Sequence, residues 1–442
     1  MSTFVSSNVD VCGNTKVIDS SIAQSVSKLL AISYSYPPRT EPRAIQVSRL
    51  LEHLDASTVL ICEGQSDTIY GSNSESQKTD SAVRTLRVPL PNSQWRDLSS
   101  RFWSRLNLPV CFRTPDHLGS WKKSVLTRIE RLITEEKYRP DVVVTFAFPL
   151  VDSIIGLELK RRYQLPWLAH FSDPWVDSPF QQYDRLTRAL NVRLERSVIE
   201  NADRLVFTSP ETAELVMRKY PLGLSAKVRT VPHAFEAELF HAPSMRDSRF
   251  IIRYLGDLYL NRTPKPLFET LGTLFSSEPE LLKRFCFEIV GDVHRLDLES
   301  MGISKLPEGL VIFRPRVSYD ESLSLMASAS GLMVIDAPVA RGSKSVFLPS
   351  KLIEYVGAGR PVIGLTPQGT AADLIRKLGG WVANPADANE LCGVMRQFLL
   401  FLSEHDKDQS AWGDPETRKG FEARNVVARF GEILTELSAV RR

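Results

Sequence analysis

Ser350, Lys351 and Glu354 bring residue types that bind anions and hydroxyl groups into one predicted helical turn. Pro349 pre-sets φ and Ser350 is a good N-cap, and the apolar spacing that follows predicts a short helix ending at residues 357–359. The first N–H groups of such a helix lack partners and its macrodipole is positive there, so this end can bind an anion. Lys351 adds a full charge, and Glu354 lies one turn further on the same face.

This pattern has two interpretations. In the first, the helix amides and Lys351 hold the phosphates of a nucleoside diphosphate, while the Glu354 carboxylate accepts hydrogen bonds from two ribose hydroxyls. In the second, Lys351 and Glu354 are a solvated ion pair on a surface helix. In both, residues 360–364 predict the start of a buried strand directly after the helix.

A glycine and an arginine follow a predicted strand in the same half of the chain. Gly256 comes directly after the strand at 250–255, and Arg262 lies in the loop before the next helix. A glycine at the end of a strand lets a phosphate approach the backbone, and an arginine beside it can hold that phosphate with two hydrogen bonds. These two residues are therefore candidates for the same site.

The first half of the chain offers three charged candidates at strand ends. Arg39 and Arg43 follow the strand predicted at 29–35, and Asp173 follows the strand predicted at 168–171. Ligands bind at the carboxyl ends of such strands, so all three could face a cleft. The arginines could instead be ordinary surface charges, and Asp173 could cap the next helix. His170, inside the second strand, is interpreted as a core histidine.

Length and composition indicate a two-domain globular protein. The chain has 442 residues, more than the about 250–300 at which a single core stops growing. Its contents of 43% hydrophobic and 24% charged residues are those of an ordinary soluble protein. A net charge of +3 gives no indication of a nucleic-acid binder. The five cysteines are scattered without metal-ligand spacing, which favours reduced thiols in the cytoplasm and no metal site.

No stretch of the sequence predicts a membrane span. No run approaches about 18 apolar residues, and residues 1–10 lack the pattern of a signal peptide. Residues 95–113 interleave four arginines with aromatic and apolar residues, which suits a phospholipid surface or an acceptor that carries a phosphate. The same segment could be an irregular helix with its arginines in water. We therefore expect a protein of the cytoplasm that could attach peripherally to the inner face of its membrane.

Strands and helices alternate twice along the chain, which predicts two doubly wound α/β domains. A flexible tail is expected at 1–26, a first domain at 27–240, a second at 249–415 and a C-terminal helix returning toward the first domain at 416–442. The predicted strands lie at 29–35, 58–63, 83–89, 142–146, 168–171, 203–208, 227–231, 250–255, 285–290, 311–313, 331–336 and 381–382. The predicted helices, besides the one that starts at Ser350, lie at 44–54, 120–136, 151–163, 183–201, 211–220, 266–275, 321–329, 370–378, 388–401 and 421–437.

In their order and spacing, these motifs resemble those of the family 4 retaining glycosyltransferases. The resemblance runs through most of residues 29–438 and is most specific in the segment around Lys351. It rests on Pro37-Pro38, Asp173-Pro174-Trp175, Val231-Pro232-His233, Tyr254-Leu255-Gly256 with Arg262, and Pro349 to Tyr355 with Gly357, Gly359 and Pro361. It implies an α/β fold of the GT-B architecture, with two Rossmann-like domains facing an inter-domain cleft.

The resemblance also implies roles for the candidate residues. The second domain would hold a nucleotide-sugar, with Glu354 on the ribose, Arg262, Lys351 and the helix start at Ser350 on the pyrophosphate, and Gly256 beneath it. The sugar would be transferred with retention of configuration and without a metal. Asp173 would lie near the reacting sugar, as in a subgroup that makes surface polysaccharides.

Three departures from the family pattern affect these expectations. Val346 stands where many members have a glutamate near the sugar, Phe148-Pro149 stands where many have a histidine, and Glu41-Pro42 replaces a glycine pair. The surface-polysaccharide subgroup is similar in lacking that histidine. Contacts in the first loop are the ones that Glu41-Pro42 places in doubt.

The leading hypothesis is an enzyme that uses a nucleotide-sugar such as a UDP- or GDP-sugar and needs no cofactor. Its acceptor would be a glycan or a lipid-linked glycan, entering near Arg39, Arg43 and residues 95–113. The alternative is a non-catalytic GT-B protein that binds a nucleotide-sugar or a partner, suggested by Val346 and the absent histidine. A sugar-nucleotide epimerase of the same fold should offer more acidic and histidine residues around the cleft.

Overall fold

The computed structural model describes the chain in several ranges. They are residues 26, 28–64, 83–91, 115–116, 118–178, 183–240, 249–258, 262–293, 296–339, 344–405 and 411–439. Of the tail predicted at 1–26 only Val26 is described, and the segment 95–113 lies outside the described residues.

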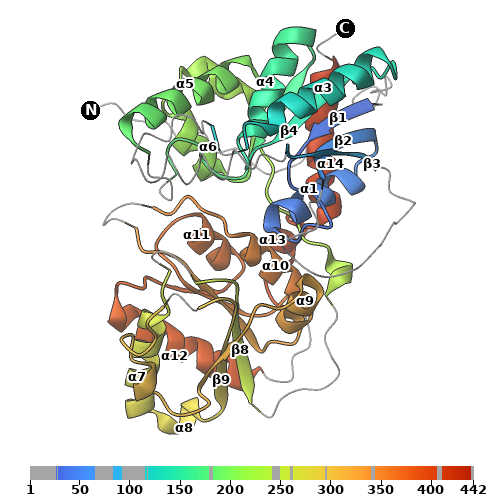
Figure 1. Cartoon of the computed structure of the whole chain (residues 1–442). Helices are drawn as coiled ribbons and strands as arrows, with labels where there is room; N and C mark the ends of the chain where they lie inside the picture. Colours follow the sequence, from blue (N-terminus) through green and yellow to red (C-terminus); the bar gives the residue numbers. More distant parts are fainter. Residues whose placement is uncertain are drawn as a thin grey trace, which may run out of the picture.

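The N-terminal domain is built on a parallel sheet of seven strands (Figure 1). Their order is β3-β2-β1-β4-β5-β6-β7. The strands are β1 (Lys28–Ile32), β2 (Ser57–Gly64), β3 (Val83–Pro89), β4 (Val142–Phe146), β5 (Trp167–Phe171), β6 (Arg204–Phe207) and β7 (Val228–Thr230). The order reverses between β1 and β4, and the crevice at such a point is where ligands bind in doubly wound sheets.

Helices cover both faces of this sheet. One face packs against α3 (Trp121–Thr134), α4 (Val151–Tyr163), α5 (Arg185–Asn201) and α6 (Pro210–Met217). The other face packs against α1 (Pro42–Glu52) and the last helix of the chain, α14 (Ala423–Ala439). The central strands β4 and β5 are buried along their whole length, which is why they are largely apolar runs in the sequence, whereas the edge strands β3 and β7 are partly exposed.

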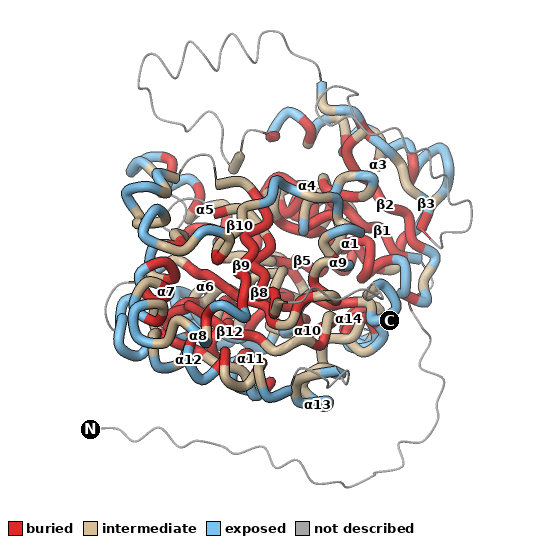
Figure 2. The backbone as a smooth tube through the Cα atoms, turned by 90° about the horizontal axis from the view of Figure 1, so that it is seen from below, coloured by how far each residue is buried: buried red, intermediate tan, exposed pale blue. Residues whose placement is uncertain are grey.

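The C-terminal domain repeats this design with a parallel sheet of six strands in the order β10-β9-β8-β11-β12-β13. They are β8 (Phe250–Leu255), β9 (Phe285–Val290), β10 (Val311–Arg314), β11 (Gly331–Ile335), β12 (Val362–Leu365) and β13 (Trp381–Ala383). One face packs against α7 (Lys265–Ser277) and α12 (Ala388–Glu404), the other against α9 (Tyr319–Ala327), α10 (Ser350–Ala358) and α11 (Thr370–Lys377). In Figure 2, β8 and β9 run as buried chain.

The chain crosses between the domains twice. After β7 it passes through Phe235 into the C-terminal domain, and before α14 it returns beside that segment, where the amide of Ala423 donates to the Phe235 carbonyl at 2.8 Å. Val426, Phe430 and Leu434 of α14 then fill the core under the first sheet. Figure 1 shows this helix, coloured red, among the blue strands of the N-terminal domain.

Most predicted elements are confirmed, and the misses are short. The sequence did not predict η2 (Leu222–Lys227), η3 (Ala237–Leu239), η4 (Ile303–Lys305), α8 (Pro279–Leu282) and α13 (Pro415–Lys419). Ser350 was predicted as an N-cap, and this is wrong: Pro349 occupies that position and Ser350 is the first helical residue, with no side-chain cap bond. Gly359 ends α10 in the left-handed conformation at φ 61°, as expected for a helix C-terminus.

Two further expectations concern membranes and cysteines. Among the helices that the structure describes, none is long and apolar enough to cross a bilayer. Cys62, Cys286 and Cys392, the cysteines within the described ranges, form no disulfide bond.

Candidate functional site

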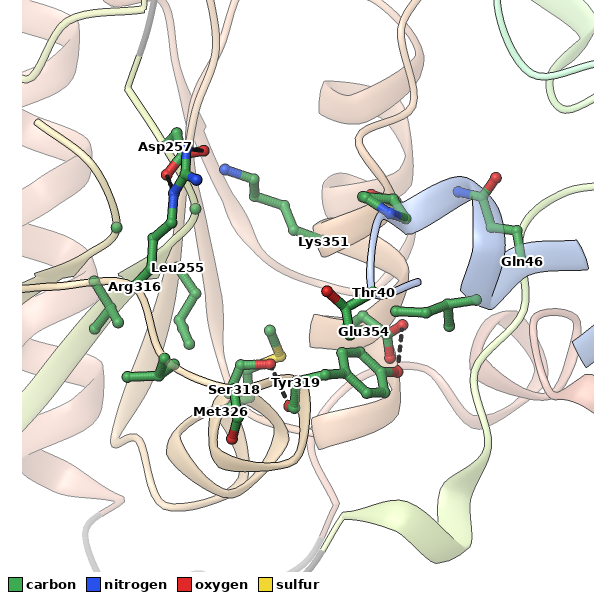
Figure 3. Close-up of a pocket in the computed structure, with 18 of the residues that line it drawn as sticks. Thr40, Gln46, Leu255, Asp257, Arg316, Ser318, Tyr319, Met326, Lys351 and Glu354 are labelled. Atoms are coloured by element: carbon green, nitrogen blue, oxygen red, sulfur yellow. Dashed lines mark hydrogen bonds and ion pairs between the residues drawn. The ribbon is translucent and has the colours of Figure 1, made fainter. Parts of the chain in front are cut away.

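A cleft of about 310 Å³ lies between the two domains. The N-terminal domain lines it with Thr40, Pro42 and other residues of the loop and first turns of α1. The C-terminal domain lines it with Gly256, Gly291 and the N-terminal end of α10. Figure 3 shows Thr40 and Gln46 of the first domain facing Lys351 and Glu354 of the second. The cleft therefore has one wall from each sheet.

Four of the residues predicted to bind a donor line this cleft: Gly256, Ser350, Lys351 and Glu354. Helix α10 begins at the cleft, so its first N–H groups and its positive dipole end face the space. Lys351 and Glu354, one turn apart, both lie on the face that lines the cleft. The structure thus brings together an anion-binding helix end, a cation and a carboxylate.

Lys351 is held over an aromatic ring at the bottom of the cleft. Its Nζ donates to the Tyr254 hydroxyl at 2.7 Å and lies 3.9 Å from the centre of the Tyr254 ring. Burial, together with the nearby positive charge of Arg262, lowers the pKa of Lys351 to about 7. In Figure 3 the side chain extends toward Asp257. Such a lysine gains its proton most readily when an anion enters, because the anion restores a partner for the ammonium group.

Arg262 lies close enough to Lys351 to affect its pKa, although Arg262 comes from the loop before α7 and Lys351 from α10. Its Nη2 lies 3.4 Å from Oδ1 of Asp336, and 12% of its side chain is exposed. Of the predicted pair of cations, Lys351 therefore lines the cleft, whereas Arg262 lies near Lys351 and is not one of the lining residues.

Gly256 provides the space that Lys351 occupies. Its φ is +129°, and a Cβ built on it would lie 2.5 Å from Lys351 Nζ. Both the backbone conformation and the close approach of the ammonium group favour glycine at this position.

A Gly256→Ala variant should unfold more easily than the wild type, with a free energy of unfolding lower by about 1–3 kcal/mol. Urea unfolding measures this loss. The matched control is Gly379→Ala, because Gly379 also has a positive φ, +86°, but a Cβ added to it would meet no atom within 4 Å. The control reports backbone strain alone, so equal losses in the two variants would contradict a steric role for Lys351.

Glu354 does not pair with Lys351 in this structure. Its Oε1 accepts hydrogen bonds from Arg49 Nη1 at 2.7 Å and from the Tyr319 hydroxyl at 3.1 Å. Only 12% of the Glu354 side chain is exposed. The interpretation of a solvated Lys351–Glu354 pair is therefore wrong, and the carboxylate belongs to the inner wall of the cleft.

Asp173 lies at the carboxyl end of β5 and does not cap the next helix. That helix, α5, is capped by Asp184, whose side chain accepts from the amides of Leu186 and Thr187. Asp173 Oδ2 accepts from Ser172 Oγ at 3.0 Å. Burial raises the pKa of Asp173, and the Ser172 hydrogen bond and the charges of Arg43 and Arg262 oppose that rise. Arg262 belongs to the C-terminal domain, so Asp173 is within electrostatic reach of that domain, although it is not one of the residues that line the cleft.

Buried side chains fix the loop that carries Asp173. Glu195 of α5 accepts from the Val176 amide at 2.9 Å, and Asn191 accepts from Trp175 Nε1 at 2.8 Å. Glu195 is 1% exposed and Asn191 is fully buried. The carboxylate of Asp173 is therefore presented from a rigid turn.

Arg39 and Arg43, predicted on the acceptor side, do not line the cleft. Arg39 pairs with Glu63 at 2.6 Å, and Arg43 is buried against the Phe146 ring and donates to the His170 carbonyl at 3.3 Å. Burial lowers the pKa of Arg43 to about 10. Both arginines are instead held by partners within the N-terminal domain, because Arg43 lies on the buried face of α1 and Arg39 is bound by the Glu63 carboxylate. His170 is 2% exposed, which confirms it as a core histidine.

Comparison with known proteins agrees with this geometry. The family model described as "Glycosyl transferase 4-like domain" matches residues 41–234. The matched range covers most of the N-terminal domain, which is therefore similar to this family model. No curated protein matches the sequence.

Solved structures with the same fold cover nearly the whole chain. Sucrose-phosphate synthase from Thermosynechococcus elongatus is 16% identical, with a TM-score of 0.61 over 94% of this chain and 100% of that one. The E. coli protein described as trehalose-6-phosphate bound with UDP-2-fluoro glucose is 13% identical, with a TM-score of 0.60 over 93% and 99%. The lipopolysaccharide outer core galactosyltransferase WaaB is 13% identical, with a TM-score of 0.58 over 92% and 99%. These likenesses show the two-domain GT-B fold.

Sequence reasoning missed several residues of this GT-B cleft. Arg316 lines it and holds Asp257 through two hydrogen bonds, at 2.8 and 2.6 Å. Arg49 and Tyr319 meet at Glu354, and His233 lies nearby in the cleft wall. Asp257 could have been found because it follows Gly256 directly. Arg49 and Tyr319 lie within regular helical patterns, and nothing in the sequence distinguishes them.

The cleft residues also bear on metal binding. Within the part of the chain that the structure describes, no group of three or more His, Cys, Asp or Glu residues could hold a metal ion. Among the described residues, the charged ones that line the cleft are three cations and two carboxylates: Arg49, Arg316, Lys351, Asp257 and Glu354.

Proposed function

We propose that this protein transfers a sugar from a nucleotide-diphosphate sugar to a glycan or a lipid-linked acceptor. The observation that carries the proposal is the inter-domain cleft in which the start of α10, Lys351 and Glu354 converge. Helix amides and a lysine suit the two phosphates, and a carboxylate one turn away suits the ribose. The GT-B fold and the glycosyl transferase 4-like domain support a nucleotide-sugar as the substrate.

The chemistry follows from the charge that develops on the leaving group. As the bond between the sugar and the diphosphate breaks, negative charge accumulates on the phosphate oxygens and must be stabilised. Lys351, Arg262 and the amides of α10 can supply that stabilisation, with Gly256 allowing close approach. We therefore propose a transfer that needs neither a metal ion nor a cofactor and that retains the configuration of the sugar, as in the family that the motifs resemble.

Asp173 is the proposed catalytic residue. The positive charge of Arg262, from the C-terminal domain, acts on its carboxylate, and that carboxylate can stabilise positive charge at the reacting carbon of the sugar. The acceptor would approach over the N-terminal domain, near Arg39 and near Arg43, whose positive charge acts on Asp173. A role in polysaccharide synthesis at the inner face of the cytoplasmic membrane is part of this proposal.

Replacing Glu354 with Gln tests the donor site. A hydrogen bond to a charged group contributes about 1.5–3 kcal/mol, so Glu354→Gln should weaken binding of UDP or GDP roughly tenfold to a hundredfold. Isothermal titration calorimetry on the purified protein measures this, after a thermal-shift screen has selected the base. Glu422→Gln is the control, because Glu422 is a carboxylate outside the cleft that pairs with Arg424. Unchanged affinity in Glu354→Gln would contradict the ribose assignment.

One observation favours a non-catalytic binding protein as the second candidate. Val346 stands at the position of the expected glutamate, and its carbonyl accepts from Thr212 Oγ1 at 3.2 Å and from Ser209 Oγ at 3.4 Å. Its side chain offers no charge to the sugar. Incubation with a panel of nucleotide-sugars separates the two functions, because a transferase should slowly hydrolyse one donor. Binding without hydrolysis or transfer would support the second candidate.

A further inference from the structure

Arg49 of the N-terminal domain binds the carboxylate of Glu354, the group that we propose accepts hydrogen bonds from the ribose of the donor. The guanidinium lies on α1, and its side chain is only 4% exposed. Nη1 donates to Glu354 Oε1 at 2.7 Å, and Nη2 lies 3.4 Å from Oε2. The two residues are 305 positions apart and belong to different domains. This ion pair therefore joins the two walls of the cleft.

Other contacts of Arg49 fix the guanidinium in place. Nη1 also donates to the Ala234 carbonyl at 2.6 Å, Nε to Glu236 at 3.2 Å, and Nη2 to the Tyr319 hydroxyl at 2.5 Å. Burial alone would lower the pKa of Arg49, but the neighbouring Glu354 and Tyr319 raise it, so the group stays charged. Its partners come from the linker between the domains and from α9, which makes Arg49 the meeting point of three segments.

These contacts decide which lone pairs of Glu354 remain for a ligand. A carboxylate has about four acceptor positions, two on each oxygen. Oε1 already accepts from Arg49 and from Tyr319, so both of its positions are taken. Oε2 has one long contact, at 3.4 Å, which leaves it at least one acceptor position, and Glu354 is one of the residues that line the cleft. Glu354 can thus accept from a ribose chiefly through Oε2, rather than through both oxygens as the sequence suggested.

We propose that Arg49 is a positioning residue of the donor site, which holds the Glu354 carboxylate so that Oε2 receives a ribose hydroxyl only when the two domains are joined. This inference rests on the proposed function. Because the guanidinium comes from the N-terminal domain, ribose recognition by the C-terminal domain depends on its partner. The planar guanidinium group is required at this position. Only arginine can contact both carboxylate oxygens of Glu354 and the neighbouring acceptors of Ala234 and Glu236 at the same time.

The test compares ligands that differ only in the ribose hydroxyls. Binding of UDP or GDP, whichever binds the wild type, is measured beside its 2′,3′-dideoxy analogue and inorganic pyrophosphate. The variants are Arg49→Gln, Arg49→Lys and Glu354→Gln. In the wild type the dideoxy analogue should bind about tenfold or more weakly than the parent nucleotide. That ratio should fall to about threefold or less in all three variants, while pyrophosphate binding changes less than about threefold.

Two controls separate positioning from general stability. Thr212→Val removes another inter-domain hydrogen bond, to the Val346 carbonyl, without touching Glu354, and it should keep the wild-type ratio. Arg49→Lys keeps the positive charge, so it carries the test if Arg49→Gln fails to fold.

The possible outcomes are distinct. A ratio that falls in Glu354→Gln but stays at the wild-type value, or rises, in both Arg49 variants overturns the role of Arg49 and leaves the donor site intact. If the wild type binds neither UDP nor GDP, or does not distinguish the dideoxy analogue, the proposed function fails at the ribose itself.

Discussion

Lys351→Met should weaken binding of a nucleotide-sugar about a hundredfold and abolish the dependence of that binding on pH above neutrality. The loss in affinity is expected because a charge-assisted hydrogen bond contributes about 1.5–3 kcal/mol and the lysine lies in a desolvated position. UDP-glucose and GDP-glucose are suitable probes, since both of their phosphates are esterified and do not titrate near neutral pH.

The sign of the pH effect follows from the lowered pKa of Lys351, about 7 in the free protein. Above that pH the free protein has lost the proton, whereas the bound phosphates favour the ammonium form and raise the pKa. Binding then takes up a proton, so affinity falls as the pH rises above 7. Between pH 7.0 and 8.5 we expect a loss of roughly tenfold in the wild type.

Calorimetry at several pH values measures both effects in one series. Lys344→Met is the matched control, because it removes the same charge from an exposed position outside the cleft. It should leave the affinity and its pH dependence unchanged. A wild-type affinity that stays constant from pH 7.0 to 8.5 would contradict the assignment of Lys351 to the phosphates.

Asp173→Asn should lower the turnover number about a thousandfold while the affinity for the nucleotide-sugar changes less than about threefold. A thousandfold loss corresponds to about 4 kcal/mol of transition-state stabilisation, a typical effect of removing one well-placed charge from a reacting centre. The substitution preserves shape and the acceptor for Ser172 Oγ, so the rigid turn should persist. Burial raises the pKa of Asp173, so turnover in the wild type should decline on the acid side at a higher pH than an ordinary aspartate would cause.

Transfer kinetics with the donor found by screening, together with donor binding, test this expectation. Asp177→Asn is the control from the same loop, since Asp177 pairs with Lys219 at 2.6 Å on the side of α6. It should change turnover much less. Equal losses in the two variants would show that the loop, and not the carboxylate of Asp173, is what catalysis requires.

Local sequence patterns predicted several strands and one helix with their correct first and last residues. Strands β3, β4, β8 and β9 and helix α4 have the predicted bounds. Buried parallel strands are continuous apolar runs, and helices between them show a repeating apolar face, so both signals are contained in short windows of sequence. The short helices α8 and α13 were missed because a single turn carries too little pattern to detect.

Most of the residues predicted to bind the donor also come from one short segment, the first turns of α10. Lys351 and Glu354 are one turn apart on a helix whose start the sequence indicated, so their common face followed from helical geometry. The error at Ser350 is a shift of one residue at the helix start. The sequence left open whether Asp173 caps the next helix. Only the structure answers this question, because it shows that Asp184 caps α5.

The sequence by itself determined the alternation of strands and helices, the position of the helix that carries Lys351, and the face on which Glu354 lies. Tertiary structure alone decided that Arg49, 305 residues away, meets Glu354, that Arg43 is buried, and that Lys351 loses its proton near pH 7. The physical reason is the range of the interactions. Helical and strand patterns depend on neighbours a few residues apart, whereas ion pairing and desolvation depend on which distant segments the fold brings together.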